Sequence, residues 1–186
     1  MIAARWALWW TTLAVVLALN RPGVEPRVGV LATAALALGA ACALFAVLAR
    51  LRLRPLLPPP GRRATAARLT LHFTGRAAFE EALWRGLVLA PCSAALGPAP
   101  ALALSTGGFA ASHVGTQGRQ AASHVLTGAT FGAVYLVTGH LLGAVLAHAT
   151  YDLLVTVAVL AQKPCPVRAM VGGGRPPYDH VTEAAR

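Results

Sequence analysis

The sequence predicts an all-α protein, a polytopic membrane bundle of about six transmembrane helices. Hydrophobic residues make up 56% of the chain and charged residues only 12%, about half of the roughly 25% that soluble domains carry. Successive apolar runs approach or exceed the roughly 20 residues that a helix needs to cross a bilayer. This composition excludes an ordinary soluble domain, so the runs are expected to face lipid.

Two apolar runs come first, at about 2–19 and 28–49. A secretory signal peptide is the alternative for the first run, because Arg5 precedes its apolar core. The following "ALNRPG" lacks a clear small-residue cleavage site, which favours a retained helix. Four further spans are expected at about 66–90, 98–114, 120–137 and 141–161.

These runs divide the chain into three parts. Residues 1–65 form an N-terminal two-helix membrane segment with a basic loop, and residues 66–161 form the main helix bundle. Residues 162–186 are rich in Pro, Gly and charge. Chain ends of this kind are commonly mobile, so the last part is expected to be a flexible tail.

The net charge of +10 at pH 7 would suit a nucleic-acid partner, but the charge is placed as in membrane proteins. Basic residues cluster between apolar runs, as in "RLRLRP" at 50–55, whereas the loops on the other side hold only Arg21 and Arg27. By the positive-inside rule, both termini are expected to be cytoplasmic. Fifteen of the sixteen basic residues are Arg, a bias typical of GC-rich genomes that favours a bacterial inner membrane.

Two glycine pairs fit the spacing that lets membrane helices approach closely. They are "GATFG" at 128–132 and "GHLLG" at 139–143. We expect both pairs to act as packing devices in a tight bundle.

Ionisable residues inside a bilayer are costly, at roughly 2.5–3.5 kcal/mol for a central charge on insertion scales. They are expected to face the bundle interior and to pair with one another. Among the ionisable residues within the predicted spans are Glu80, Glu81, Arg85, His113, His124, His148 and Asp152. We expect His124 to serve in packing or hydrogen bonding.

Helical spacing sorts these residues into pairs. Glu81 and Arg85 are four apart, so they share a helix face and can form an ion pair. Glu80 is turned by about 100° around the same helix, which leaves it available for another role. His148 and Asp152 are also four apart. The spacing predicts that several helices bring polar groups to a similar depth.

Three motifs now stand in order along the chain: "EEALWR" at 80–85, "FAASH" at 109–113 and "HATYD" at 148–152. They resemble the three motifs of the CPBP family, which comprises CAAX-type prenyl-protein proteases and bacteriocin-processing enzymes. The resemblance covers about residues 68–157, roughly half of the chain. It implies a glutamate-dependent intramembrane endopeptidase, acting on a membrane-associated protein or peptide substrate in contact with the lipid bilayer.

The resemblance also implies roles. Glu80 would be the general base that activates water, and His113 would position or polarise that water. His148 and Asp152 would stabilise the oxyanion. Two further residues would be structural partners of the site: Glu81 and Arg85. An ionised Asp152 would repel an oxyanion, so either this carboxyl is protonated or it orients and charges His148.

Two other functions fit the same residues. His113, His148, Asp152 and a glutamate are ligand types that zinc accepts, which would make a zinc-dependent membrane hydrolase. No "HExxH" helix is present, and the glutamate–arginine pairing favours a site without cofactors. The other alternative is a non-catalytic protein of the bacteriocin-immunity type. The residues do not select among leader peptides, C-terminal sorting segments and lipidated tails as substrates, nor do they indicate an oligomeric state.

Overall fold

The computed structural model describes residues 27–51 and 66–161, together with residues 7, 11 and 14. This part of the chain is built from helices and contains no strand, which confirms the predicted all-α fold class. The first predicted span at 2–19, most of the basic loop and the C-terminal tail lie outside the described residues.

The helical elements follow the apolar runs of the sequence. In chain order they are α2 (Val30–Arg50), α3 (Ala66–Glu81), η1 (Ala82–Leu89), α4 (Ala90–Leu96), α5 (Pro98–Gln117), η2 (Gly118–Ala122), α6 (Ser123–Thr138) and α7 (Leu141–Ala161).

Three helical stretches in the described part are long and apolar enough to cross a membrane: Val30–Arg50, Val114–Thr138 and Leu141–Ala158. The second stretch contains a turn at Gly118, where φ is 54°, so its straight portion is α6. The membrane character of the chain is therefore evident, while the number of six spans stays a prediction.

Two of the turns between helices have clear local causes in the sequence. Gly97, with a φ of 83°, ends α4, and Pro98 then opens α5 at a position where its missing N–H costs nothing. Gly139 ends α6 in the left-handed conformation, with a φ of 71°, and its N–H bonds to the carbonyl of Tyr135. The left-handed residue lets α7 start within two residues of the end of α6.

Residues Ala82–Leu89 form a π-helical stretch directly after the two glutamates. Its wider turn is seen at Ala90, whose N–H bonds to the carbonyl of Arg85, five residues earlier. The wide turn fits the presence of Pro91, whose ring would crowd the carbonyl four residues before it in a regular α-helix. Single π-helical turns are frequent at functional sites.

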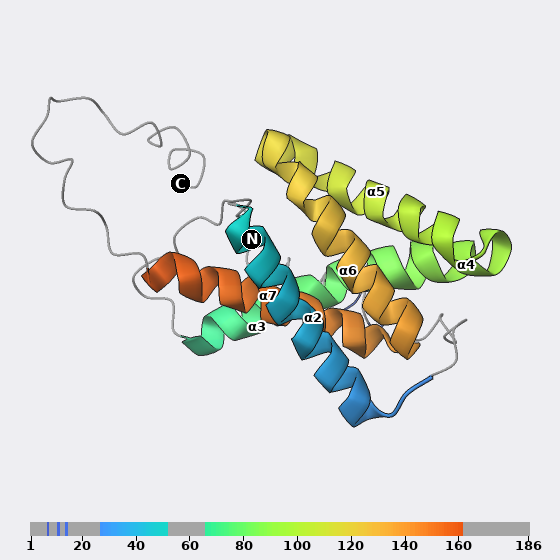
Figure 1. Ribbon diagram of the computed structural model, residues 1–186, viewed down its shortest axis with the longest axis horizontal. Helices are drawn as coiled ribbons and strands as arrows, with labels where there is room; N and C mark the ends of the chain where they lie inside the picture. Colours follow the sequence, from blue (N-terminus) through green and yellow to red (C-terminus); the bar gives the residue numbers. More distant parts are fainter. Residues whose placement is uncertain (1–6, 8–10, 12–13, 15–26, 52–65, 162–186) are drawn as a thin grey trace, which may run out of the picture.

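The helices form one bundle in which α2 packs across α7, α5 lies beside α6, and α3 packs on α7 (Figure 1). Small side chains make the contact between α2 and α7 close: Ala37, Ala41, Ala144 and Ala147 are fully buried. Small residues allow backbones to approach in lipid, where tight packing replaces the hydrophobic effect as the driving force.

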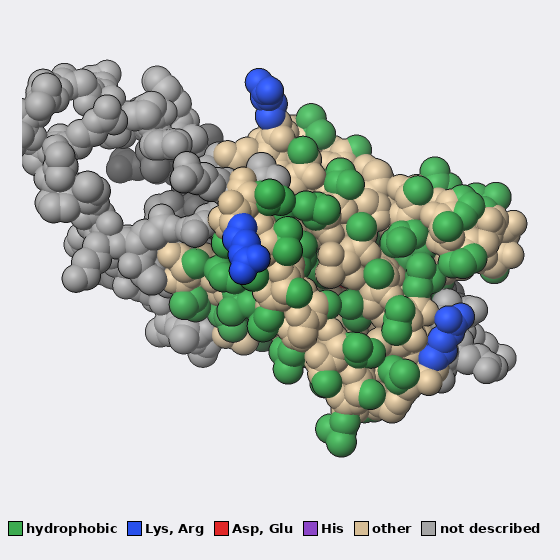
Figure 2. Space-filling model, viewed as in Figure 1, with side chains coloured by type: hydrophobic (Ala, Val, Ile, Leu, Met, Phe, Trp, Pro, Cys, Tyr) green, Lys and Arg blue, Asp and Glu red, His purple; other side chains and the backbone are tan. Residues whose placement is uncertain are grey.

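Hydrophobic side chains cover most of the face shown in Figure 2, and no acidic or histidine side chain is visible among its described residues. Val30 and Leu31 are 63% and 88% exposed, as lipid-facing residues are expected to be. Most ionisable groups singled out in the sequence are buried, namely Glu81, Arg85, His113, His124, His148 and Asp152, and Glu80 is half-buried.

The "GATFG" pair packs as predicted. A side chain at Gly128 would meet the ring of Phe109 at 3.0 Å, and one at Gly132 would run into Leu102, so both glycines bring α6 close to α5. The expectation for "GHLLG" is right only for Gly143, where an added Cβ would meet Thr33 of α2 at 2.9 Å. Gly139 serves instead as the turn residue between α6 and α7.

Replacing Gly128 by Leu is expected to lower the thermal unfolding temperature of the purified protein in detergent. The new side chain would push against Phe109, which is fully buried, and overpacking of this kind costs about 1–3 kcal/mol. Gly107→Leu on α5 is the matched control, because Gly107 is exposed and has open space around its Cβ position. Equal unfolding temperatures for the two variants would contradict this packing role.

Candidate active site

The structure brings all six predicted site residues into one cluster. Glu80 and Glu81 end α3, Arg85 lies on η1, His113 on α5, and His148 and Asp152 on α7. Oε2 of Glu80 lies 3.8 Å from Nε2 of His148 and 4.0 Å from Nε2 of His113. The helices that carry the three motifs therefore converge, as the sequence predicted.

Glu81 links an arginine to a histidine in the middle of the bundle. Nε of Arg85 lies 2.9 Å from Oε2 of Glu81, in an ion pair whose two side chains are both fully buried. Nδ1 of His148 lies 2.7 Å from the other oxygen, Oε1. Helical spacing predicted the first contact but not the second, so Glu81 does more than neutralise Arg85.

Arg85 is held by three further contacts. Its Nη2 donates to the backbone carbonyl of Gly128 on α6, at 2.7 Å. Its guanidinium carbon lies 5.1 Å from the ring centroid of Phe109 and 5.9 Å from that of Phe131. Cations over aromatic faces are attracted by the ring quadrupole, and more so when water is absent. One arginine thus joins η1 to α5 and α6.

The same two phenylalanines hold the histidine rings in place. Phe131 stacks on His148, with centroids 4.6 Å apart and planes at 20°, and Phe109 meets His113 edge-on at 4.8 Å. The structure therefore gives a physical reason for the phenylalanine that opens "FAASH": its ring contacts both the arginine and the histidine of the cluster.

Glu80 has an ionic partner that the sequence analysis missed. Nε of Arg76 lies 2.7 Å from Oε1 of Glu80, so the expectation of an unpaired Glu80 is wrong for one of its two oxygens. The signal was present in the sequence, because Arg76 and Glu80 are four apart, as Glu81 and Arg85 are. The other oxygen, Oε2, has no hydrogen-bond partner among the described residues.

His113 presents its Nε2 toward Glu80. Its Nδ1 lies 2.9 Å from the backbone carbonyl of Phe109, which can only accept, so Nδ1 carries a proton. The ring also stacks on His124 at 3.9 Å, and His124 lies 3.0 Å from Oε1 of Gln117. His124 thus serves in packing and hydrogen bonding, as predicted.

Nε2 of His148 lies between two carboxylate oxygens. It is 3.8 Å from Oε2 of Glu80 and 3.7 Å from Oδ2 of Asp152, and neither oxygen has a hydrogen-bond partner in the described part of the chain. These distances exceed those of a direct hydrogen bond, about 2.7–3.2 Å. They suit groups that share a small bridging molecule such as water.

Comparison with known families agrees with this geometry. Residues 62–154 match the model of a family described as type II CAAX prenyl endopeptidase Rce1-like. The chain belongs to this Rce1-like family. The match covers half of the 186 residues and includes all three motifs, which confirms the resemblance seen in the sequence. No curated protein and no solved structure matches the chain significantly.

Membership in the Rce1-like family indicates the general class of function. The chain is an integral membrane protein of a CAAX-type protease family, and its substrate is a protein or peptide in the membrane.

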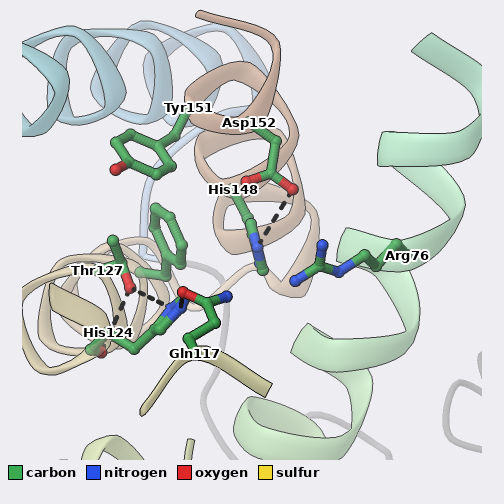
Figure 3. Close-up of a pocket in the computed structure, with 8 residues that line it drawn as sticks. Arg76, Gln117, His124, Thr127, His148, Tyr151 and Asp152 are labelled. Carbon is green, nitrogen blue, oxygen red and sulfur yellow. Dashed lines mark hydrogen bonds and ion pairs between the residues drawn. The ribbon is translucent and has the colours of Figure 1, made fainter. Parts of the chain in front are cut away.

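A small pocket opens beside the cluster of this Rce1-like chain (Figure 3). Its walls come from α3, α6 and α7 and from the end of α5, and it reaches His148 and Asp152. Its lining residues are Arg76, Gln117, His124, Thr127, Phe131, His148, Tyr151 and Asp152. No group of three or more His, Cys, Asp or Glu in the described part of the chain is arranged to hold a metal ion.

Arg85→Ala is expected to lower the folded yield and the unfolding temperature strongly. The change removes the arginine that faces Glu81 in a fully buried position, and breaking a buried ion pair in this way costs about 3–5 kcal/mol. Yield after size-exclusion chromatography and thermal unfolding in detergent measure the effect.

Arg50→Ala is the control, because Arg50 is an exposed residue at the end of α2. Arg85→Lys is expected to fall between Arg85→Ala and wild type, because a lysine keeps the charge but lacks the planar fork whose separate N–H groups meet Glu81 and Gly128. An Arg85→Ala protein as stable as the Arg50→Ala control would overturn the structural role.

Proposed function

We propose that this chain is a glutamic-type intramembrane endopeptidase in which Glu80 activates the water that hydrolyses a peptide bond. The observation that carries the proposal is the unoccupied Oε2 of Glu80, which faces Nε2 of His113 at 4.0 Å and Nε2 of His148 at 3.8 Å. A general base must reach the proton that it removes, directly or through one water, and Oε2 faces both histidines closely enough for one water to bridge them.

The proposed reaction starts with a water molecule among these three groups. Oε2 of Glu80 takes a proton from it, and the resulting hydroxide attacks the scissile carbonyl carbon, so that a C–O bond forms and the carbonyl electrons move onto oxygen. When the tetrahedral intermediate collapses, the C–N bond breaks. The proton held by Glu80 passes to the leaving nitrogen, which restores the carboxylate. Holding water and base in one geometry removes much of the entropic cost of the step.

His113 and His148 take different parts. His113 has its Nδ1 proton directed at the carbonyl of Phe109, so the lone pair of a neutral ring lies at Nε2 and can accept a proton from the water in a hydrogen bond. His148 donates from Nδ1 to Glu81, and a second proton on Nε2 would face Glu80 and Asp152. We assign Nε2–H of His148 as the donor to the oxyanion. Such donors are worth about 3–4 kcal/mol each.

The family name guides the choice of a first substrate. The matching family is described as CAAX prenyl endopeptidases, so a peptide with a farnesylated C-terminal CAAX sequence is the first probe. Leader peptides and C-terminal sorting segments remain the other substrate classes. A wild-type protein that folds but cleaves none of the three would favour the non-catalytic reading of the immunity type.

Glu80→Gln is expected to abolish cleavage of the probe by protein reconstituted in lipid vesicles, while leaving the unfolding temperature close to that of wild type. The substitution keeps the size of the side chain and removes the base. Glu183→Gln, in the C-terminal segment outside the described residues, is the isosteric control and is expected to retain activity.

Retained cleavage in Glu80→Gln would exclude Glu80 as the base. Chelators are expected to have no effect on wild type. If a chelator abolished cleavage and added zinc restored it, the zinc-dependent hydrolase would replace the proposal, because His and carboxylate side chains of this cluster are zinc-ligand types.

We also propose that the chain lies in a bacterial inner membrane with both termini cytoplasmic. The arginines of the loop after α2 support this orientation through the positive-inside rule. A single cysteine added at the C-terminus of a cysteine-free variant is expected to react with a membrane-impermeant maleimide only after the cells are opened. Labelling in intact spheroplasts would reverse the orientation.

A further inference from the structure

Arg76 lies in none of the three motifs, yet it contacts two groups of the proposed catalytic centre. Its Nε lies 2.7 Å from Oε1 of Glu80, and its Nη2 lies 3.4 Å from Nε2 of His113. Figure 3 shows the side chain pointing from α3 toward His148 and Asp152 of α7. A single guanidinium thus touches the base and one of the histidines that face it.

We propose that Arg76 is a positioning residue that fixes the orientation of the Glu80 carboxylate, so that one oxygen is held by the arginine and the other faces the two histidines; this rests on the proposed function of Glu80. The arginine occupies Oε1 and leaves Oε2 turned toward the two histidines. The terminal torsion of a glutamate is broad and roughly two-fold, so an unheld carboxylate would rotate freely. An arginine can hold one oxygen firmly because its N–H groups are fixed in a plane.

The comparison of the two glutamates supports this role. Both oxygens of Glu81 have a partner within 3 Å: Nε of Arg85 lies 2.9 Å from Oε2, in an ion pair without hydrogen-bond geometry, and Nδ1 of His148 lies 2.7 Å from Oε1. Glu80 has one oxygen held at 2.7 Å, whereas the two histidines that face its other oxygen are 3.8 and 4.0 Å away. Each glutamate has its own arginine four residues away: Arg76 precedes Glu80, and Arg85 follows Glu81. The two glutamates differ in the partner of the second carboxylate oxygen.

The contact with His113 adds a second function for the same side chain. Since Nδ1 of His113 carries a proton toward Phe109, a neutral ring offers only a lone pair at Nε2. Nη2 of Arg76 approaches this lone pair at 3.4 Å, which is longer than a strong hydrogen bond, so the water of the proposed reaction can replace the arginine as donor. Arg76 thereby contacts both the base and the neighbouring histidine, and it gives up the histidine lone pair when the water binds.

Arg76→Gln tests the proposal with the farnesylated CAAX peptide as the probe. We expect kcat to fall roughly 10- to 100-fold, the range for a lost hydrogen bond to a charged group, while KM stays within about two-fold. Arg76→Lys is expected to recover part of kcat, because it keeps the cation near Oε1. Combining Arg76→Gln with Glu80→Gln should lower the rate no further than Glu80→Gln alone, because the residue acts through Glu80.

Arg50→Gln is the matched control and is expected to keep wild-type kcat and KM. A kcat for Arg76→Gln within two-fold of wild type would overturn the proposal. So would a raised KM with unchanged kcat, which would make Arg76 a substrate-binding residue. If Arg76→Gln does not fold, the kcat of Arg76→Lys tests the proposal instead. Lysine lacks the planar guanidinium, so a wild-type kcat in Arg76→Lys would show that the guanidinium does not orient Glu80.

A second measurement needs no substrate. The carboxylate infrared band of Glu80 can be assigned as the band lost in Glu80→Gln, and it is expected to shift in Arg76→Gln and to stay in place in Arg50→Gln. An unshifted band in Arg76→Gln would show that Arg76 does not hold Glu80. If wild type cleaves no probe, the proposed function fails, and the band alone then decides whether Arg76 holds the carboxylate.

Discussion

The buried contact between Arg85 and Glu81 is the constraint on which the rest of the site depends. Neither side chain is exposed at all, and a charge left alone at membrane depth is too costly to persist. Satisfying the arginine requires the carbonyl of Gly128 on α6, and satisfying Glu81 requires His148 on α7. Helices far apart in sequence are therefore fixed by one set of charges, and Nε2 of His148 turns toward Glu80 as a result.

The two adjacent glutamates show how one helix end produces two different carboxylates. A rotation of about 100° separates them. Glu81 points into the bundle and is fully buried, whereas the Glu80 side chain keeps 17% exposure and lies beside Arg76. Glu81 is buried with a close partner for each oxygen, whereas Glu80 has a close partner for only one, which suits the base role proposed for it. The distinction comes from position on the helix rather than from residue type.

The sequence predicts the helix runs and the local ion pair well, because both depend on hydropathy and on the four-residue spacing of a helix. The bond from His148 to Glu81 could not be predicted, since it joins residues 67 apart and needs the packing of α7 on α3. The π-helical stretch was missed because no composition rule marks it. Arg76 was overlooked although it obeys the same spacing rule as Arg85, because no motif drew attention to it.

Charge balance within the cluster relates Asp152 to the role given to His148. Arg76 and Arg85 bring two positive charges, and three carboxylates, Glu80, Glu81 and Asp152, bring three negative ones. A net charge in a low-dielectric interior is unfavourable, and a doubly protonated His148 would cancel it. Its Nδ1 already meets Glu81 at 2.7 Å, and its Nε2 faces the other two carboxylates at 3.7 and 3.8 Å. A protonated Asp152 would cancel the same net charge. Of these two states, the imidazolium is the one that supplies the Nε2–H donor of the proposed reaction.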